Sequence, residues 1–483
     1  MNSRPNSEQL HNIVIIPFKC KPWAFLLDYS HQKIENAVFL DLSRIQSLRP
    51  ITRDRKRFQT RIIESSNFLN YRFGTWKSLI VALLSLPTNF RKFRRSKTII
   101  CKQSQVSIDE ILDCRLAAFL GIRNFDRKDT PFFEFMRHYI VTYRTAVELD
   151  FFLKNFTLPV EKVIVFNGRE PLEATCIRIA DKYCLPTQII EKGSDNSRFQ
   201  VFRNSPHFHP DWWELINSCN ANQKLSELSM QAESYLEAKL KGIDPYFGDR
   251  WMDKTNQNVE VDEFIDSNTV VYFTSSSTEF SPFSRFNYEV GYRNQYEAVE
   301  SLANECLRIK NKLIIRRHPN SVGIDRVDRE KPDWQRIVSK FPSNQIRYVG
   351  PFESFATYEN VKKCRMVFVW KSSIGFETLA LNKPTFAMAS AKWSWNKELR
   401  CWSKEEIKYA LEHAESLVAE FRENVVAQYA NFMSQSGTKC IIFKSAHKWG
   451  IILNDNSKIN NGIFENFIQR IQSKAPKFFG RRV

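Results

Sequence analysis

The residues best suited to chemistry lie in the stretch Met366–Pro384 (MVFVWKSSIGFETLALNKP). Met366–Trp370 is a compact apolar run with the length of a buried parallel strand, and a helical pattern follows it. Ser372 and Ser373 fall at the junction, where free backbone N–H groups and the positive end of a helix dipole can bind an anion. Glu377 follows about one turn later, and its carboxylate could accept hydrogen bonds from a ribose. The alternative is a plain serine cap on an ordinary helix.

Two other strand ends nearby in the sequence also carry polar groups. The apolar run Val270–Phe273 leads into Thr274–Glu279, which includes Ser275, Ser276 and Glu279, and Leu313–Ile315 leads into Arg316-Arg317-His318-Pro319-Asn320. Polar groups at successive strand ends are typical of the ligand crevice of a doubly wound sheet. No G-x-G-x-x-G or Walker A pattern occurs, which disfavours dinucleotide and P-loop chemistry.

A similar pattern occurs in the first half of the chain. The strand pattern Val163–Phe166 precedes Asn167-Gly168-Arg169, and Thr187–Ile190 precedes Glu191-Lys192-Gly193, with a helical pattern between them. This order predicts a β-α-β unit whose functional groups lie at the carboxyl ends of its strands. The alternatives are a plain Asn-Gly turn and a solvated loop carboxylate.

His207 and Asp211 lie in the segment Pro206–Asp211, just before Trp212 and Trp213. They are candidates for a general base or an anion contact. Without a further ligand nearby, the His-x-His-x-Asp pattern is weak evidence for a metal, so we expect no metal site.

The size and charge of the chain narrow its class. Its 483 residues are too many for one ordinary core, which favours two domains. The net charge of +18, from 71 Lys and Arg against 53 Asp and Glu, indicates a negatively charged partner such as phosphate-bearing substrates, an anionic membrane surface or nucleic acid. The ten cysteines form no CxxC pair, and no apolar stretch has the length of a spanning helix or a signal peptide, so we expect a cytoplasmic protein.

One segment of the first half suits a membrane surface. The apolar run Trp76–Leu86 is too short to span a bilayer, Pro87 is expected to end its helix, and Asn89–Lys97 places five basic residues around Phe90 and Phe93. Basic and aromatic residues beside an apolar helix favour an interfacial membrane contact. A core helix followed by a solvated basic loop is equally consistent, and nucleic-acid binding ranks third because no nucleic-acid module accompanies the segment. The tail Lys474–Val483 repeats the basic and aromatic composition.

The alternating patterns predict three parts of the chain. These are an N-terminal Rossmann-like domain over residues 1–250, a second Rossmann-like domain over 265–400, and a helical tail over 401–483 that crosses back to the first domain.

The motifs together resemble those of bacterial capsule and surface polysaccharide biosynthesis proteins. That family includes Kdo-transferring enzymes, and it is more distantly similar to CDP-glycerol glycerophosphotransferases and to sialyltransferases with an HP motif. The resemblance covers about residues 160–390 and rests on Phe166-Asn167-Gly168-Arg169 with Glu191-x-Gly193, on Arg317-His318-Pro319-Asn320, and on Ser372-Ser373-x-Gly375-x-Glu377 with Lys383-Pro384.

The resemblance implies an α/β GT-B fold, in which two Rossmann-like domains face a cleft and the second domain holds a nucleotide donor. It implies that His318 contacts the donor phosphate or assists the leaving group, that Ser372 and Ser373 bind that phosphate, and that Glu377 binds the ribose. The remaining expected donor contacts are Ser275, Ser276, Glu279, Arg317, Asn320 and Gly375. The first domain would face the acceptor through Asn167, Gly168, Arg169 and Gly193.

We therefore expect a metal-independent glycosyltransferase without cofactors, acting on a nucleotide sugar and a polysaccharide or lipid-linked acceptor, peripheral at the inner face of the cytoplasmic membrane. Donor cations and a helix dipole would neutralise the leaving phosphate, and His207, Glu191 and Asp211 are the candidate bases. A CDP-alditol phosphotransferase and a non-catalytic polysaccharide assembly or export protein remain as alternatives.

Overall fold

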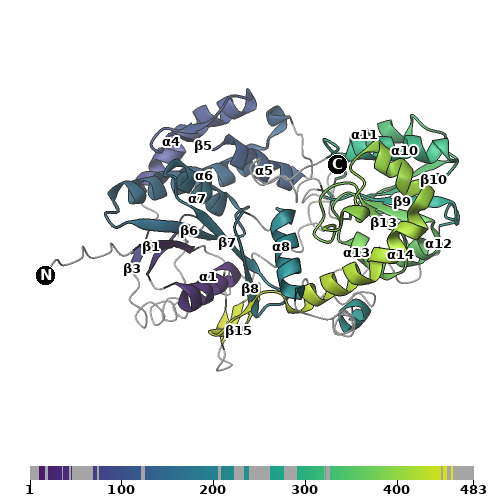
Figure 1. Cartoon of the computed structure of the whole chain (residues 1–483). Helices are drawn as coiled ribbons and strands as arrows, with labels where there is room; N and C mark the ends of the chain where they lie inside the picture. Colours follow the sequence, from purple (N-terminus) through teal and green to yellow (C-terminus); the bar gives the residue numbers. More distant parts are fainter. Residues whose placement is uncertain are drawn as a thin grey trace. The chain divides into compact units, whose positions relative to one another are not determined.

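The structure is a computed structural model of the whole chain (Figure 1). It describes residues 10–16, 20–34, 36–42, 45, 69–72, 76–120, 126–204, 208–221, 233–238, 262–276, 291–319, 321–322, 327–447, 450–453 and 458–460. The chain forms two compact units. Unit 1 comprises Met1–Phe119, Asn124–Pro206 and Gly437–Val483, and unit 2 comprises Leu120–Arg123 and His207–Ser436.

Unit 1 is built on a mainly parallel sheet of seven strands in the order β14-β8-β7-β6-β1-β2-β3. Neighbouring strands from β7 to β3 are parallel, while β8 pairs antiparallel with both β7 and β14. Along the chain, the parallel strands therefore follow the Rossmann order 3-2-1-4-5. Their bounds are β1 (His11–Ile16), β2 (Ala37–Asp41), β3 (Leu69–Arg72), β6 (Val160–Phe166), β7 (Thr187–Lys192), β8 (Arg198–Phe202) and β14 (Thr438–Lys439).

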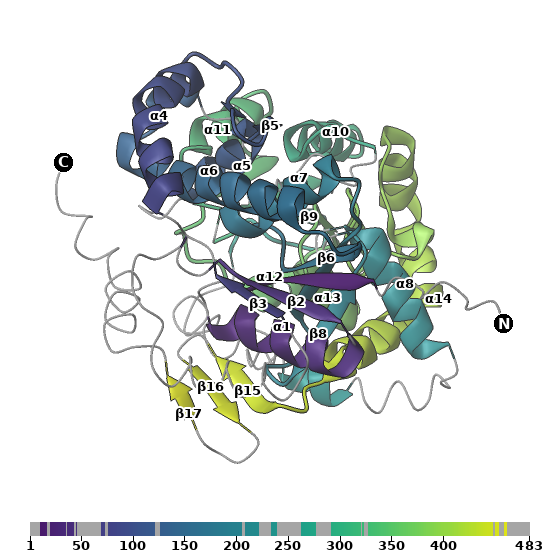
Figure 2. The same ribbon diagram turned by 90° about the vertical axis from the view of Figure 1, so that its left-hand side faces the viewer.

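Helices cover both faces of this sheet, as its apolar strands require. Helix α1 lies on one face, where Phe25 stacks on Phe166 of β6 with ring centroids 6.0 Å apart, and the helices α6 and α7 lie on the other (Figure 2). A small antiparallel sheet of β15, β16 and β17 packs on α1, where Phe443 contacts Phe25 at 5.4 Å. The bounds are α1 (Cys20–Lys33), α5 (Asp109–Leu120), α6 (Phe132–Asn155), α7 (Pro171–Lys182), β15 (Phe443–His447), β16 (Gly450–Leu453) and β17 (Lys458–Asn460).

Helix α4 (Trp76–Arg94) packs on α6 and passes through Pro87, so the prediction that Pro87 ends the helix is wrong. Pro87 lies on the exposed side, where water can solvate the carbonyl that loses its N–H partner. On the packed side, Asn89 Nδ2 donates to the hydroxyl of Tyr139 at 2.6 Å, and the hydroxyl of Ser85 lies 2.8 Å from the same atom. Contacts with α6 therefore stabilise helical residues on both sides of the proline.

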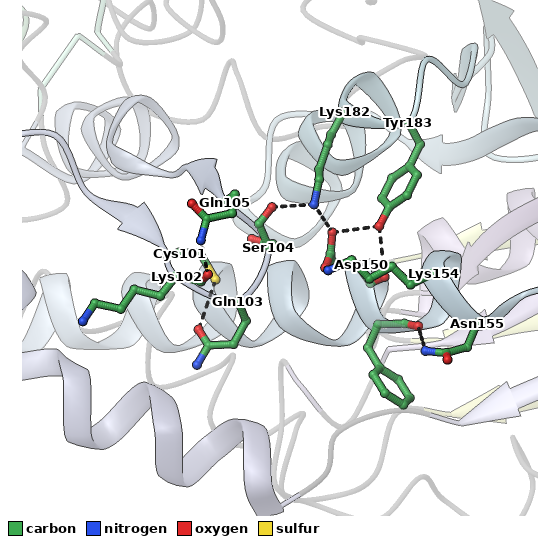
Figure 3. A network of polar contacts seen from close by, with 11 residues as sticks. Cys101, Lys102, Gln103, Ser104, Gln105, Asp150, Lys154, Asn155, Lys182 and Tyr183 are labelled. Carbon is green, nitrogen blue, oxygen red and sulfur yellow. Dashed lines mark hydrogen bonds and ion pairs between the residues drawn. The ribbon is translucent and has the colours of Figure 1, made fainter.

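A polar network anchors the hairpin of β4 (Ile100–Cys101) and β5 (Val106–Ser107) to α6 and α7 (Figure 3). Lys182 Nζ donates to the Ser104 carbonyl at 2.6 Å and to Asp150 Oδ1 at 2.5 Å. The Tyr183 hydroxyl donates to the same carboxylate at 3.0 Å, and Lys154 pairs with its other oxygen at 3.0 Å. Burial opposes ionisation of Asp150, but these hydrogen bonds outweigh it and lower the pKa of Asp150.

Unit 2 contains a five-stranded, wholly parallel sheet in the order β11-β10-β9-β12-β13, which is again 3-2-1-4-5 along the chain. The strands are β9 (Thr269–Phe273), β10 (Lys312–Arg316), β11 (Ile346–Val349), β12 (Met366–Val369) and β13 (Thr385–Ala387). The helices are α8 (His209–Asn220), α10 (Gln295–Arg308), α11 (Lys331–Val338), α12 (Thr357–Lys363), α13 (Ile374–Ala380) and α14 (Lys404–Gln435).

Two parallel-sheet domains of Rossmann type are thus confirmed, but their limits differ from the prediction. The first domain ends at Pro206 instead of near residue 250, because α8 packs on α14 of unit 2. In that contact, Asn431 Nδ2 donates to Asn220 Oδ1 at 2.8 Å inside the unit. The tail does return to the first domain, at Gly437. It returns as strands, whereas its helical part, α14, belongs to unit 2.

Candidate functional site

The carboxyl ends of β10, β9 and β12 lie next to one another in unit 2, as the sequence predicts. The backbone N–H of His318, after β10, donates to Thr274 Oγ1, after β9, at 2.9 Å. The backbone N–H of Lys371, after β12, donates to Ser275 Oγ at 2.9 Å. The loop after β9 therefore positions both neighbouring loops. It lies at the point where the strand order reverses, which is the usual ligand position in such sheets.

Ser275 and Ser276 are buried to 1% exposure each, and their contact with a donor stays a prediction. The backbone of Ser275 exchanges two hydrogen bonds of 3.2 Å with the side-chain amide of Gln295 at the start of α10. Because its hydroxyl also accepts from Lys371, Ser275 is a positioning residue.

The two arginines after β10 are also internal. Arg317 is fully buried, donates to Glu330 at 2.9 Å and lies over the ring of Trp334. Arg316 donates to the Gly350 carbonyl and lies over Phe355, and burial lowers its pKa to about 10. A buried guanidinium group needs partners, and each of these arginines has at least one hydrogen bond within the unit. A contact between Arg317 and a donor phosphate stays a prediction.

His318 is half-buried and remains at the strand edge. Its carbonyl accepts from the backbone N–H of Ser321 at 3.0 Å and from the Ser321 hydroxyl at 2.7 Å. Together with the bond to Thr274, these contacts hold the backbone on both sides of the imidazole. His318 is therefore a side chain on a rigid support at the carboxyl edge, as a binding or catalytic group requires.

The junction between β12 and α13 differs from the expected anion cradle. The N–H groups of Gly375 and Phe376 bond back to the carbonyls of Ser372 and Ser373 at 3.3 and 3.0 Å, so they are not free as predicted. Ser373 is exposed and Ser372 is half-buried, so both hydroxyls remain at the edge. The tight turn therefore uses the N–H groups of Gly375 and Phe376, and the two serine hydroxyls are the side-chain donors at this edge.

Gly375 has a packing role. A Cβ at this position would lie 2.2 Å from Cζ2 of Trp393, a residue that is itself 1% exposed. Trp393 Nε1 donates to the Ser372 carbonyl at 3.0 Å. The glycine therefore admits the tryptophan that holds the serine turn, and its predicted contact with the donor has no direct support.

Glu377 is half-buried on α13, and its Oε2 accepts from the hydroxyl of Tyr358 on α12 at 2.8 Å. This bond orients the carboxylate.

The structure places two cations near His209 of α8 that the sequence analysis did not assign a role. Lys371 follows β12 and is 7% exposed, and Lys392 lies beyond the end of β13. Burial lowers the pKa of His209 well below its ordinary value, and the nearby charges of Lys371 and Lys392 lower it further. His209 Nδ1 lies 2.5 Å from the Ser390 carbonyl, which can only accept, so this nitrogen carries the proton of a neutral ring. In the sequence, the position of Lys371 directly before Ser372 could have indicated that this lysine lies beside the site.

The expected acceptor-side residues also meet, at the carboxyl edge of unit 1. Asn167 and Gly168 both have positive φ, and Asn167 Nδ2 donates to Glu191 Oε2 across the β6–β7 pair. Glu191 Oε1 accepts from its neighbour's backbone N–H at 2.9 Å, and the side chain is 8% exposed. With both oxygens engaged, Glu191 is better placed to hold the Asn-Gly turn than to accept a proton. Arg169 is half-buried beside this turn.

The remaining predicted residues are placed as follows. Gly193 lies in the β7–β8 hairpin, where its N–H donates to the Arg198 carbonyl at 2.7 Å. Asp211 is half-buried in the first turn of α8 and so belongs to unit 2. Within the part of the chain that the structure describes, no group of three His, Cys, Asp or Glu side chains could hold a metal ion, and no helix is long and apolar enough to cross a membrane. Three predicted residues lie outside the described residues: His207, Glu279 and Asn320.

No protein-family model and no curated protein matches the chain. Solved structures do. A Thermosulfurimonas dismutans KpsC β-Kdo 2,4-transferase matches with 14% identity and a TM-score of 0.37, over 65% of this chain and 87% of that one. The UDP-GlcNAc 2-epimerase of Methanocaldococcus jannaschii, in complex with UDP-GlcNAc and UDP, matches with 9% identity and a TM-score of 0.27, over 96% and 100%. The wall teichoic acid polymerase TagF matches with 11% identity and a TM-score of 0.23, over 98% and 90%.

The first of these proteins is a Kdo transferase, as are some members of the family that the sequence motifs resemble. The assignment of an α/β fold with two Rossmann-type sheets rests on the strand orders and registers of this chain.

Proposed function

We propose that the protein is a glycosyltransferase of bacterial surface polysaccharide synthesis, in which unit 2 binds a nucleotide-activated sugar of the Kdo-like class and unit 1 binds the glycan acceptor. The observation that carries the proposal is the junction of three parallel strand ends in unit 2. There, hydrogen bonds through Thr274 and Ser275 hold His318 and Lys371 at the point where the strand order reverses. The sequence resemblance supplies the class of reaction.

The donor phosphate would be held by side chains. Glycosyl transfer breaks the bond between the anomeric carbon and the phosphate oxygen, so negative charge develops on the leaving nucleotide. His318, Ser372 and Ser373 supply hydrogen-bond donors at this edge, and Lys371 supplies positive charge directly before the two serines. Glu377, oriented by Tyr358, would accept hydrogen bonds from the ribose hydroxyls.

The acceptor hydroxyl must lose its proton as its oxygen bonds the anomeric carbon. Asp211 and His207 are the proposed bases, ahead of Glu191, whose two oxygens are already engaged in unit 1. Arg169 beside the Asn-Gly turn would contact the acceptor. Metal independence and action at the inner face of the cytoplasmic membrane belong to the same proposal.

The test is an incubation of purified protein with CMP-Kdo, CDP-glycerol, UDP-sugars and GDP-sugars, with glycan acceptors and with EDTA present. We expect release of nucleotide and a product whose mass rises by one sugar. A mass increase of one glycerol phosphate from CDP-glycerol would instead indicate attack on phosphorus. No turnover of any donor, together with glycan binding, would favour the assembly or export alternative.

The variant His318→Ala should lower transfer by about 10-fold or more without changing the far-ultraviolet spectrum. His413→Ala is the matched control, because His413 is an exposed histidine on α14 of the same unit. Equal activity of both variants and the wild type would remove His318 from the mechanism.

A further inference from the structure

Helix α4 of unit 1 has one packed face and one apolar face that is exposed. The packed face is formed by Ser78, Leu79, Ala82, Leu86, Asn89 and Phe93. Outside it, Trp76 is 73% exposed, Ile80 53%, Leu83 45% and Leu84 77%. At about 100° per residue, these four side chains fall on a single stripe, and the exposed Pro87 continues it. Large apolar side chains gathered on one exposed face indicate a docking surface more than chance exposure does.

The same stripe ends in positive charge. Arg91 and Arg94 follow Pro87 at helical spacing, and both are exposed. From Ser65 to Ile108 the sequence has no acidic residue and has eight basic ones, so this segment carries a charge of +8. The apolar surface continues into exposed arginines, and the segment has no carboxylate. It is therefore complementary to a partner that has an apolar interior and an anionic exterior.

The start of α6 extends this surface beside the basic end of α4. Arg94 lies 5.9 Å from the ring centroid of Phe90, Phe90 contacts Phe132 at 5.1 Å, and Phe132 contacts Phe133 at 5.7 Å. Phe133 is 74% exposed, whereas Phe93 is fully buried against Phe135. Of the two phenylalanines within the basic segment, Phe93 is therefore a core residue, and Phe133 supplies an exposed aromatic ring next to Phe132.

We propose that unit 1 docks on an anionic lipid bilayer through an α4 surface made of Trp76, Ile80, Leu84, Phe133, Arg91 and Arg94. The aliphatic residues would enter the headgroup and acyl boundary while the arginines contact lipid phosphates. Among the described helices none could span the bilayer, so the contact is interfacial. Single-stranded nucleic acid fits less well, since it needs aromatic rings for stacking and most of this stripe is aliphatic. A second copy of the chain would bring a segment of the same +8 charge against the first.

This proposal names the surface for the membrane contact that the proposed function includes, and its test is independent of transferase activity, since binding to vesicles is measured without donor or acceptor. The test is flotation of the full chain with vesicles of phosphatidylcholine alone and of phosphatidylcholine with 30 mol% phosphatidylglycerol. We expect binding to the anionic vesicles only, weakened when the salt concentration rises from 0.1 to 0.5 M. Equal binding to both kinds of vesicle, or binding to neither, would overturn the proposal.

Two pairs of variants separate the apolar and charged contributions. Trp76→Ser/Leu84→Ser should weaken binding about 10-fold or more, whereas Phe151→Ser, on an equally exposed aromatic of α6, should not change it. Arg91→Glu/Arg94→Glu should weaken binding by about 25-fold or more, at roughly 5-fold per basic residue removed. The control is Lys362→Glu/Lys363→Glu, which makes the same change of net charge in unit 2. It should bind the vesicles more than 5-fold better than Arg91→Glu/Arg94→Glu does.

Sedimentation velocity on the free protein addresses the competing occupant of this face. The wild type and Trp76→Ser/Leu84→Ser should have the same mass. If the wild type is a dimer that this variant dissociates, the face is covered by a second copy and the membrane proposal is wrong. Because all substituted side chains are exposed, thermal unfolding should be unchanged in each variant.

Discussion

The backbone N–H of His318 donates to Thr274 Oγ1 at 2.9 Å, which joins the ends of two neighbouring parallel strands of unit 2. Thr274 itself is 1% exposed and its own N–H donates to the Arg316 carbonyl at 3.0 Å. The threonine therefore determines where the imidazole of His318 stands without reaching the site edge.

Thr274→Val keeps the shape of the side chain but removes the acceptor, leaving the His318 N–H unsatisfied. We expect a loss of about 1–2 kcal/mol in the free energy of unfolding and a fall of about 10-fold in kcat, with little change in KM. Urea unfolding and steady-state kinetics measure the two effects. Thr274→Ser retains the hydroxyl and should restore kcat; if it behaves like the valine variant, the hydrogen bond has no positioning role.

Tyr358→Phe removes the hydroxyl that donates to Glu377 at 2.8 Å. If Glu377 binds the donor ribose, a carboxylate that is no longer oriented should raise KM for the donor about 3- to 10-fold and leave kcat largely unchanged. Tyr292→Phe is the control, because it removes a 3.3 Å bond to Ser301 elsewhere in unit 2. An equal KM in both variants would show that the orientation of Glu377 does not matter for the donor.

Gly375→Ala would place a Cβ 2.2 Å from Cζ2 of the buried Trp393, so either the ring or the turn at Ser372 must move. We expect a loss of about 1–3 kcal/mol in the free energy of unfolding. Trp393→Phe makes room, and the double variant should be more stable than the sum of the two single effects predicts. Additive effects in this double-mutant cycle would mean that the glycine is required for another reason.

Asp150→Asn tests the network of unit 1 in Figure 3. The pKa of Asp150 is lowered in the folded state, so its contribution to stability is present above the unfolded pKa, near 3.9, and is lost as the pH falls through the folded value. The variant should unfold about 2 kcal/mol more easily at pH 7, and the difference from wild type should shrink below pH 4. Asp129→Asn, on an exposed carboxylate, should show no such difference.

The sequence predicted the strand ends well and the side chains on them less well. The three predicted strands of unit 2, at Val270–Phe273, Leu313–Ile315 and Met366–Trp370, differ from β9, β10 and β12 by one residue at one or both ends. The sets around His318, Thr274 and Ser372 lie on adjacent strands as expected. Apolar runs between polar loops are a local signal, and a parallel sheet must place their carboxyl ends together.

The pattern of apolar runs and polar loops could not predict which polar side chains at the strand ends are buried. Ser275 is buried because Gln295 lies against it, and Arg317 is buried because Glu330 and Trp334 receive it. These partner residues lie in later elements, at no fixed number of residues from the strand. No local sequence pattern therefore distinguishes a buried guanidinium group from one that faces a phosphate.

The sequence by itself determined the two parallel-sheet domains, the strand ends that carry chemistry and the excess of positive charge. Only the tertiary structure decided that the first domain ends at Pro206, that Lys371 stands beside the site, and that α4 keeps an apolar stripe exposed. The physical reason is that periodicity records which face of an element is apolar, whereas burial depends on what the rest of the chain packs against that face.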